Sequence, residues 1–318
     1  MEWIKKGHIF QPNGEFEWSK EYAQIPRVLL LKGKVRVFYA TRYYDQENSP
    51  ISQTSFIDLD RNNLSNILYV HDKPSLKLGG INSFSEYGIH PTMLVPQNNS
   101  IYFFYQGWQR GKEHPYRTEI GIATSKDEGL SFSKKGKEPI LKKTKFDPYF
   151  LNGVFILDKN NEFHMWYSSG KKWIKNNGKN ESVYLIKKAQ SNDLINWELN
   201  NGFCVETKLE NECQNSATVI YLNNKYHMWF CYRPAIDFRN GDRGYRIGYA
   251  FSYDMKEWIR DDSKAGIEIS NDESWDSEMI CYPYVFKLDE KIIMLYCGNY
   301  FGKSGFGYAE LKMNKLKI

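Results

Sequence analysis

The chain has 318 residues, 25% of them charged, and a formal net charge of +5. These values exclude a chain that is disordered throughout, and so small a charge, with no basic run of five, does not indicate nucleic-acid binding. No run of eighteen apolar residues occurs, so no membrane-spanning helix is expected, while an aromatic content of 16% favours strands and sugar-binding surfaces.

Five copies of one pattern follow one another along the chain, each with an apolar strand, a short polar turn and a second strand rich in aromatic residues. The second strands read KVRVFYATR (34–42), SIYFFYQGW (100–108), EFHMWYSSG (162–170), KYHMWFCYR (225–233) and KIIMLYCGN (291–299). A third strand recurs at 119–129, 184–194, 246–255 and 305–313, and a short fourth strand follows three of these. The repeats are 62 to 67 residues apart, measured between Pro26, Pro91, Gly153, Ser216 and Pro283.

Repeats of four short strands predict an all-β fold: a five-bladed β-propeller with four antiparallel strands per blade, forming a single domain over residues 1–318. The expected blades are approximately 22–75, 86–142, 147–206, 212–270 and 278–313 plus 2–10. The last repeat lacks a fourth strand, and the N-terminal EWIKKGHIF (2–10) resembles the fourth strand EWIRDDSKAGI (257–267). We therefore expect the N-terminal strand to complete the last blade and to close the ring, which covers the open sheet edges.

A carboxylate recurs just before the first strand of each repeat, at Glu21, Glu86, Asp147, Glu212 and Glu278. Five carboxylates around a channel mouth would repel one another, and this repulsion would raise the pKa values of some of them. Cleavage of a glycosidic bond needs a carboxylic acid beside a carboxylate. Alternatively, each carboxylate caps its turn by accepting hydrogen bonds from backbone N–H groups. For catalysis we predict Glu278, in apolar surroundings, as the acid, Glu212 as the base or nucleophile, and Asp147 as a modulator.

The loops between the second and third strands carry cations and aromatic residues, whereas the channel ends of the first strands carry mostly polar ones. Aromatic rings stack on sugar faces, and guanidinium groups bind carboxylate or phosphate, so the combination predicts an anionic glycan or a phosphate-bearing sugar as ligand. The alternatives are solvated loop charges and, for the histidine, a hydrogen-bonded channel residue. The predicted substrate-binding residues are Arg27, Arg42, His90, Trp108, Arg110, Asn152, Trp173, Asn215, Arg233, Arg246 and Tyr282.

Five cysteines, an odd number, lie between Cys204 and Cys297 without a CxxC spacing. They predict buried free thiols rather than a zinc site, and no metal or cofactor is expected. The N-terminal segment has no apolar secretory stretch, so a cytoplasmic location is expected. The expected partner is a carbohydrate or sugar-phosphate ligand, without nucleic acid or membrane insertion, and the oligomeric state is left open.

The strand motifs, Y-x-M-W-Y/F followed by IGYA-x-S-x-D, make the chain resemble the five-bladed propeller glycosidases and their relatives over nearly its whole length. That group includes arabinanases, xylosidases, invertases, levansucrases and mannoside phosphorylases. The run WDSEMICYP…MLYCGNYFGKSGFGYAEL is especially similar to uncharacterised members of the group found near bacterial surface-polysaccharide genes. The resemblance implies a propeller that acts on a carbohydrate, most simply as a glycoside hydrolase.

The chain departs from that group where its members usually place an Asp-Pro, at the channel end of the first strand. The matching pairs contain no acidic residue: Ile25-Pro26, His90-Pro91, Asn152-Gly153, Asn215-Ser216 and Tyr282-Pro283. Glu212-Cys213 resembles the Glu-Cys pair of the invertases, in which the Glu is the acid/base. Two other functions therefore stay open: a phosphorylase or glycosyltransferase that uses a phosphate-bearing sugar, and a glycan-binding propeller without catalysis.

Overall fold

The computed structural model describes residues 1–239 and 243–312, which form antiparallel β-sheets with very little helix. The predicted ends of the last repeat at residue 313 and of the domain at residue 318 lie outside these ranges. No helix in the described ranges is long and apolar enough to cross a membrane.

Three sheets contain four strands each. The first runs in the order β10 (Leu151–Lys159), β11 (Glu162–Asn176), β12 (Lys179–Ser191) and β13 (Glu198–Phe203). The second runs in the order β14 (Glu212–Leu222), β15 (Lys225–Pro234), β16 (Arg246–Ser252) and β17 (Ile259–Arg260). The third runs in the order β1 (Trp3–Phe10), β20 (Phe306–Leu311), β19 (Lys291–Cys297) and β18 (Cys281–Leu288).

The remaining strands form two groups that a single parallel pair, Ser52 with Gly88, joins into one sheet. The first group is β2 (Glu21–Leu31), β3 (Lys34–Tyr44), β4 (Pro50–Asp60) and β5 (Ile67–Val70). The second is β6 (Gly88–Gln97), β7 (Ser100–Arg110), β8 (Tyr116–Ser125) and β9 (Ser133–Lys134). The short helical turns are η2 (Asp262–Lys264) and α1 (Asn299–Gly302).

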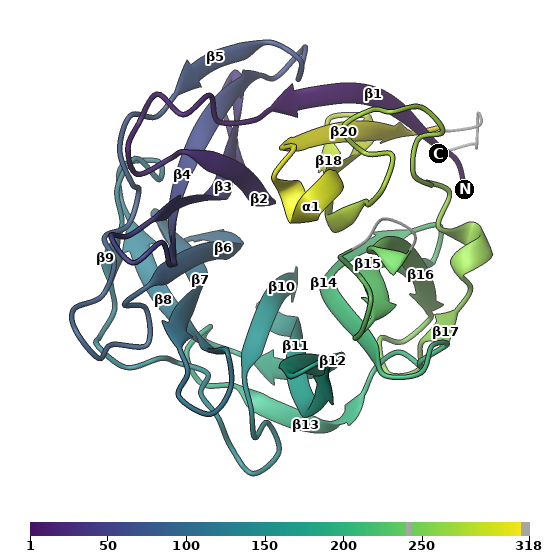
Figure 1. Cartoon of the computed structure of the whole chain (residues 1–318). Coiled ribbons are helices and arrows are strands. Elements are labelled where there is room, and N and C mark those ends of the chain that lie inside the picture. The colour runs from purple at the N-terminus through teal and green to yellow at the C-terminus, as the bar shows by residue number, and fades with distance from the viewer. Residues whose placement is uncertain (240–242, 313–318) are drawn as a thin grey trace.

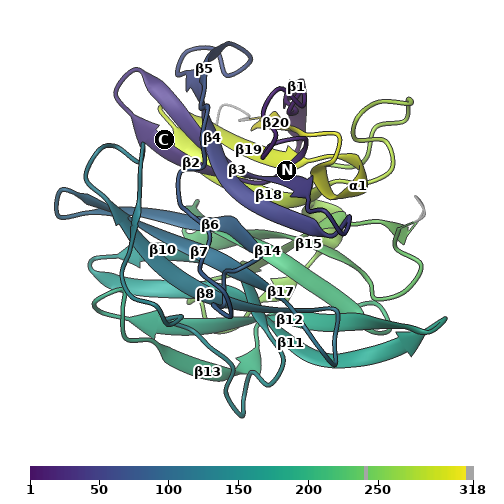
Figure 2. The same cartoon turned by 60° about the vertical axis from the view of Figure 1, so that its left-hand side comes forward.

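The sheets stand around a common centre, and the views in Figures 1 and 2 show them side by side. The first strand of each repeat lies innermost: β2, β6, β10, β14 and β18 each contact the next, and β18 contacts β2. Middle strands such as β19 are buried on both faces because neighbouring sheets cover them, and this explains their continuous apolar runs. Trp166 and Trp229 fill the core between sheets and are fully buried.

Each innermost strand has an irregular register at an equivalent place, close to the centre. Four residues there have a left-handed backbone: Ile25 (φ 56°), Gly153 (φ 62°), Ser216 (φ 52°) and Tyr282 (φ 54°). At Gly153 a side chain is also excluded, since a Cβ would overlap Asn215 Oδ1. A left-handed β-branched residue such as Ile25 is strained, and such strain gathers at functional sites.

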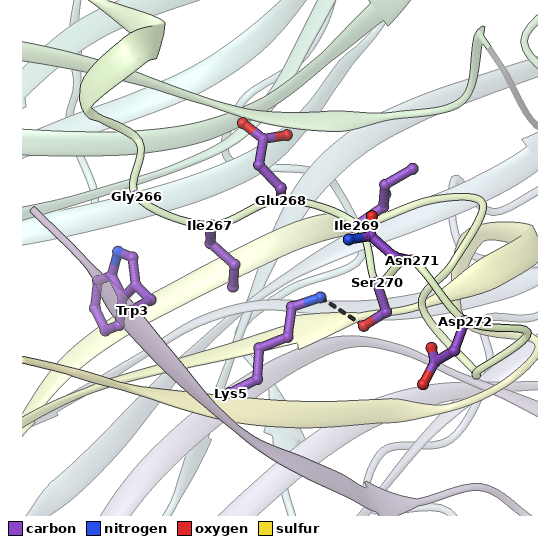
Figure 3. Close-up of a pocket in the computed structure, with 9 residues that line it drawn as sticks. All are labelled: Trp3, Lys5, Gly266, Ile267, Glu268, Ile269, Ser270, Asn271 and Asp272. Atoms are coloured by element: carbon purple, nitrogen blue, oxygen red, sulfur yellow. Dashed lines mark hydrogen bonds between the residues drawn. The ribbon is translucent and has the colours of Figure 1, made fainter.

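The N-terminal strand β1 pairs antiparallel with β20, and its other edge lies against the segment 266–272 (Figure 3). The Trp3 backbone N–H donates to Gly266 O at 2.9 Å, and the Trp3 ring packs edge-on against Trp229. Lys5 Nζ donates to Ser270 Oγ at 2.9 Å and forms an ion pair of 2.7 Å with Asp276, which is buried. Contacts on both edges therefore hold β1 in place.

Candidate functional site

A pocket of about 410 Å³ opens at the irregular ends of the innermost strands. The five residues at the channel ends of the first strands, where the sequence predicts the channel mouth, all line it: Ile25, His90, Asn152, Asn215 and Tyr282. The irregular backbone at these positions changes the alternation of side chains along each strand. A side chain from every innermost strand therefore meets the others in one pocket.

Eight of the eleven predicted substrate-binding residues line this pocket: Arg42, His90, Trp108, Asn152, Trp173, Asn215, Arg233 and Tyr282. The other three are not among its described lining residues. Arg110 forms an ion pair of 2.6 Å with Asp45 and stacks on Tyr87. Arg246 Nη1 donates to the backbone oxygens of Tyr245 and Glu278.

Arg27, the third of these, lies in the interior among the innermost strands. Its guanidinium donates to Thr92 O on β6 at 2.6 Å, to Pro26 O on its own strand and to Ser216 Oγ on β14, and it stacks on Tyr284 of β18. Burial lowers the pKa of Arg27 to about 10, which leaves it charged at neutral pH. Arg27 thus ties four innermost strands together.

Replacing Arg27 with Ala is expected to lower the free energy of unfolding by about 2–5 kcal/mol, because it opens a cavity and leaves two buried carbonyls without donors. Urea denaturation measures the change, and Lys32→Ala at an exposed position serves as the control. Wild-type stability of Arg27→Ala, combined with weaker sugar binding, would contradict the structural role and support the predicted role in substrate binding.

The pocket wall contains several buried polar atoms without a hydrogen-bond partner: Arg42 Nε, His90 Nε2, Asn152 Oδ1, Trp173 Nε1 and Arg233 Nε. A buried polar group that is left unpaired costs about 1–3 kcal/mol. Three of these five atoms can only donate. The site is therefore suited to a polar ligand that brings hydrogen-bond acceptors.

His90 is a neutral member of this set. Burial, with a smaller contribution from Arg42, lowers the pKa of His90 to about 3. At neutral pH the ring carries no charge, so its free nitrogen can donate or accept one hydrogen bond. His90 suits the binding of a hydroxyl group, and it adds nothing to the positive charge of the pocket.

Aromatic rings form much of the remaining wall. Trp173 stacks on His114 with ring centroids 4.7 Å apart and meets Tyr116 edge-on at 5.2 Å. Across the pocket lining, Phe238, Tyr245 and Phe301 add further rings. The sequence predicts the two tryptophans but not these three rings, because Phe238 and Tyr245 lie between β15 and β16 and Phe301 lies in α1, all outside the repeated strand pattern.

None of the five predicted carboxylates is among the described lining residues. Glu212 is buried: Oε1 pairs with Arg260 at 2.6 Å and Oε2 accepts from the backbone N–H of Lys208 at 2.9 Å. Asp147 is fully buried and pairs with Lys187 at 3.0 Å. The contact of Glu212 with Lys208 N is of the turn-capping kind that the sequence raised as an alternative, and Asp147 has a partner on β12. The catalytic roles of both residues stay predictions.

The other three predicted carboxylates lie nearer the surface. Glu86 accepts from the backbone N–H of Asn82, and Glu278 accepts from the Tyr300 hydroxyl at 3.3 Å. Burial would raise the pKa of Glu21, but the hydrogen bond from Tyr44 and the ion pair with Lys303 outweigh it, so this pKa is lowered. The structure does not bring Glu212 and Glu278 together in the pocket.

Glu181 is the one carboxylate among the described residues that line the pocket. It lies on β12 and forms a two-pronged ion pair with Arg239, with distances of 2.6 and 3.2 Å. The signal for it was the turn Asn177-Gly178, which closes the long hairpin of β11 and β12 and sets Glu181 opposite Ile174, the residue after Trp173. The repeated carboxylate pattern covers only positions before the first strands, so it does not predict Glu181, which lies within a third strand.

No group of three or more His, Cys, Asp or Glu residues in the described ranges could hold a metal ion. All five cysteines are free, four of them are buried, and Cys204 is half-buried. Burial raises the pKa of Cys231 to about 12, so this thiol stays protonated at neutral pH.

No family model matches the chain. Two proteins of Mycobacterium tuberculosis, uncharacterized protein MT1551 of strain CDC 1551 and uncharacterized protein Rv1502 of strain H37Rv, are each 31% identical to it over 314 residues. Each alignment covers 98% of this chain and 100% of the mycobacterial protein.

Solved structures of glycoside hydrolases have a similar fold. One glycoside hydrolase superposes with a TM-score of 0.72 and 16% identity, covering 99% of this chain and 93% of its own. A thermostable family-43 glycoside hydrolase superposes with a TM-score of 0.68 and 16% identity, and the match covers 94% of this chain and 92% of that one. A third structure comes from the GH130 family of mannoside phosphorylases, which contains glycoside hydrolases. It superposes with a TM-score of 0.67 and 14% identity, and the match covers 98% of this chain and 93% of that one. The chain therefore has the propeller-like fold of glycoside hydrolases.

Proposed function

We propose that this chain, which belongs to the same family as the two mycobacterial proteins, is a carbohydrate-active enzyme that binds an anionic sugar in its central pocket. The observation that carries the proposal is the chemistry of the pocket wall. Tryptophan, tyrosine and phenylalanine rings stand beside amides and buried donors that lack acceptors. Rings and amides are the groups that bind sugars, and guanidinium groups bind their acidic substituents.

The charge of the pocket supports an anionic ligand. Three arginines, Arg42, Arg233 and Arg239, stand against the single glutamate Glu181, and His90 is neutral. The described lining therefore has a formal charge of +2, while the protein as a whole has only +5 over 318 residues. A carboxylate or phosphate on the sugar would balance this charge.

We assign the proton transfer to Glu181, since a catalytic carboxyl group must reach the reacting bond. The predicted pair Glu212 and Glu278 stays a prediction, and their positions outside the pocket lining favour Glu181. Hydrolysis ordinarily uses two carboxyl groups that flank the bond. A pocket lined by one carboxylate and three arginines favours a second candidate, phosphorolysis, in which phosphate held by the arginines replaces the second group.

We also infer that the fold is a five-bladed propeller within a single domain. The five innermost strands contact one another in a closed order, and the parallel joint between β4 and β6 is a single residue pair. Dividing the largest sheet at that joint gives five antiparallel groups of four strands. The pairing of β1 with β20 supports closure by the N-terminal strand.

A panel of 4-nitrophenyl glycosides, neutral and acidic, tests the function when each is assayed with and without inorganic phosphate. We expect an acidic glycoside to be cleaved in preference to its neutral counterpart. Release without phosphate supports hydrolysis, and release that requires phosphate supports phosphorolysis. If calorimetry shows sugar binding but no glycoside is turned over, the protein is a glycan-binding protein and not an enzyme. If none of the sugars binds, the proposal is overturned.

A further inference from the structure

Three side chains on one wall of the pocket form a continuous hydrogen-bonded chain. Arg233 lies at the end of β15, Tyr184 on β12, and Tyr245 directly before β16, and all three line the pocket. Arg233 Nη2 donates to the Tyr184 hydroxyl at 3.1 Å. The Tyr184 and Tyr245 hydroxyls share a hydrogen bond. Arg233 also interacts with Tyr245 directly, since its guanidinium lies 5.1 Å from the centre of the Tyr245 ring. The hydrogen bonds run in the order Arg233, Tyr184, Tyr245.

Arg233 is a buried cation, with 6% of its surface exposed, and its observed partners carry no negative charge. Nη1 donates to Pro234 O at 2.8 Å, and the guanidinium lies 3.4 Å from the centre of the Phe238 ring. Its Nε has no hydrogen-bond partner. Burying a charge without an opposite charge is costly, so an anion that pairs with the buried and unpartnered Nε would remove part of that cost.

The hydroxyl protons of the two tyrosines can be counted. There are two protons, and the bond between the hydroxyls uses one of them. Within residues 1–239 and 243–312, no other acceptor receives a hydrogen bond from either hydroxyl. Burial raises the pKa of both tyrosines well above the usual value, so both stay protonated at neutral pH. One phenolic O–H is therefore left to donate to a ligand.

The hydrogen bond from Arg233 determines which of the two tyrosines carries this free proton. A hydroxyl that accepts a hydrogen bond from a cation becomes a stronger donor, because hydrogen bonds in a chain polarise one another. Arg233 interacts with both tyrosines, but the hydrogen bond of 3.1 Å that Nη2 donates goes to Tyr184. Tyr184 is therefore the better donor of the pair and Tyr245 the better acceptor. The remaining proton then lies on Tyr245, at the end of the chain.

We propose that Arg233, Tyr184 and Tyr245 form a polarised donor chain that recognises an anionic oxygen, carboxylate or phosphate, on the ligand. Tyr245 Oη and Arg233 Nε are the two donors that contact this oxygen, and Tyr184 is a positioning residue that links them. The inference rests on the proposed function in that it places the acidic group of the sugar on this wall of the pocket. This donor chain of three side chains thus determines specificity for acidic over neutral sugars.

Calorimetric titration with two small anions, inorganic phosphate and acetate, tests the chain without knowledge of the sugar. We expect the wild type to bind at least one of them, and Tyr245→Phe to bind it about tenfold to a hundredfold more weakly, as the loss of a hydrogen bond to a charged group predicts. Tyr184→Phe should weaken binding as well. Because the three hydrogen-bonded side chains act as a unit, the double variant should lose no more affinity for the anion than the weaker-binding single variant does.

The matched control is Tyr105→Phe, which removes a buried hydroxyl outside the pocket lining. Binding that is unchanged in Tyr245→Phe, or that is lost equally in the control, would overturn the inference, as would additive effects of the two tyrosine variants. Failure of both anions to bind the wild type would also overturn it. If a neutral sugar still binds in that case, the proposed carbohydrate function survives, so the two failures are distinguishable.

Discussion

Replacing Glu181 by Gln is expected to lower turnover by about 10²-fold or more, while thermal unfolding changes little. The amide keeps the shape of the side chain and one acceptor for Arg239, but it cannot take up or release the proton that bond cleavage requires. Turnover is measured on the glycoside that the panel identifies, at saturating substrate, so that weaker binding and slower chemistry are separated.

Two further glutamate variants make this result specific. Glu162→Gln alters an exposed residue at the far end of the same hairpin and is expected to have wild-type turnover. Glu278→Gln tests the pair predicted from the sequence. A large loss in Glu278→Gln together with normal turnover in Glu181→Gln would show that the predicted pair is catalytic and that our assignment of Glu181 is wrong.

Deleting residues 1–10 is expected to abolish the folded state at 25 °C. The deletion uncovers the edge of β20, and it removes the buried side chains Trp3, Ile9 and Phe10. Each such loss costs about 2–5 kcal/mol, and their sum approaches the whole stability of a typical domain, about 5–15 kcal/mol. Near-ultraviolet circular dichroism and size-exclusion chromatography report the loss of packing and the association of the open edges.

A milder variant, Lys5→Met, isolates one contact of this strand. Burial would raise the pKa of Asp276, but its bonds to Lys5 and Ser270 outweigh this, so the pKa lies below its usual value. Because the pKa is lowered in the folded state, the pair contributes stability above about pH 4, and this is lost as the pH falls. Lys5→Met should therefore be less stable at pH 7 and should lose less on acidification. Unchanged melting of both variants would contradict closure by β1.

The repeated strand pattern allowed the sequence to predict much of the fold. The predicted second strand at 162–170 lies within β11, and the N-terminal 2–10 corresponds to β1, which pairs where the similarity to 257–267 predicts. These features are local: alternation of apolar residues and turn residues acts over a few positions. For the same reason His90 and Asn215, next to the repeated strand starts, were identified as pocket residues.

The carboxylates show what the sequence left open. The position of Glu212 before a first strand was equally consistent with a catalytic role and a turn-capping role, and only the tertiary structure shows that its carboxylate is paired with Arg260. Glu278 was expected to be the buried acid, yet two residues earlier Asp276 is the buried one, paired with Lys5 of β1. Such pairs join residues far apart in the chain, which no local pattern specifies.

The sequence by itself determined the all-β repeat, the order of its strands and the strand ends that form the pocket, because each depends on periodicity within one strand and its turn. Only the tertiary structure decided which charged groups share the pocket. Glu181 meets Arg239 across 58 positions of sequence, and Tyr184 meets Tyr245 across 61. These meetings arise because neighbouring sheets pack around one centre, and the burial that results leaves the Arg233 guanidinium enclosed, with its Nε unpaired.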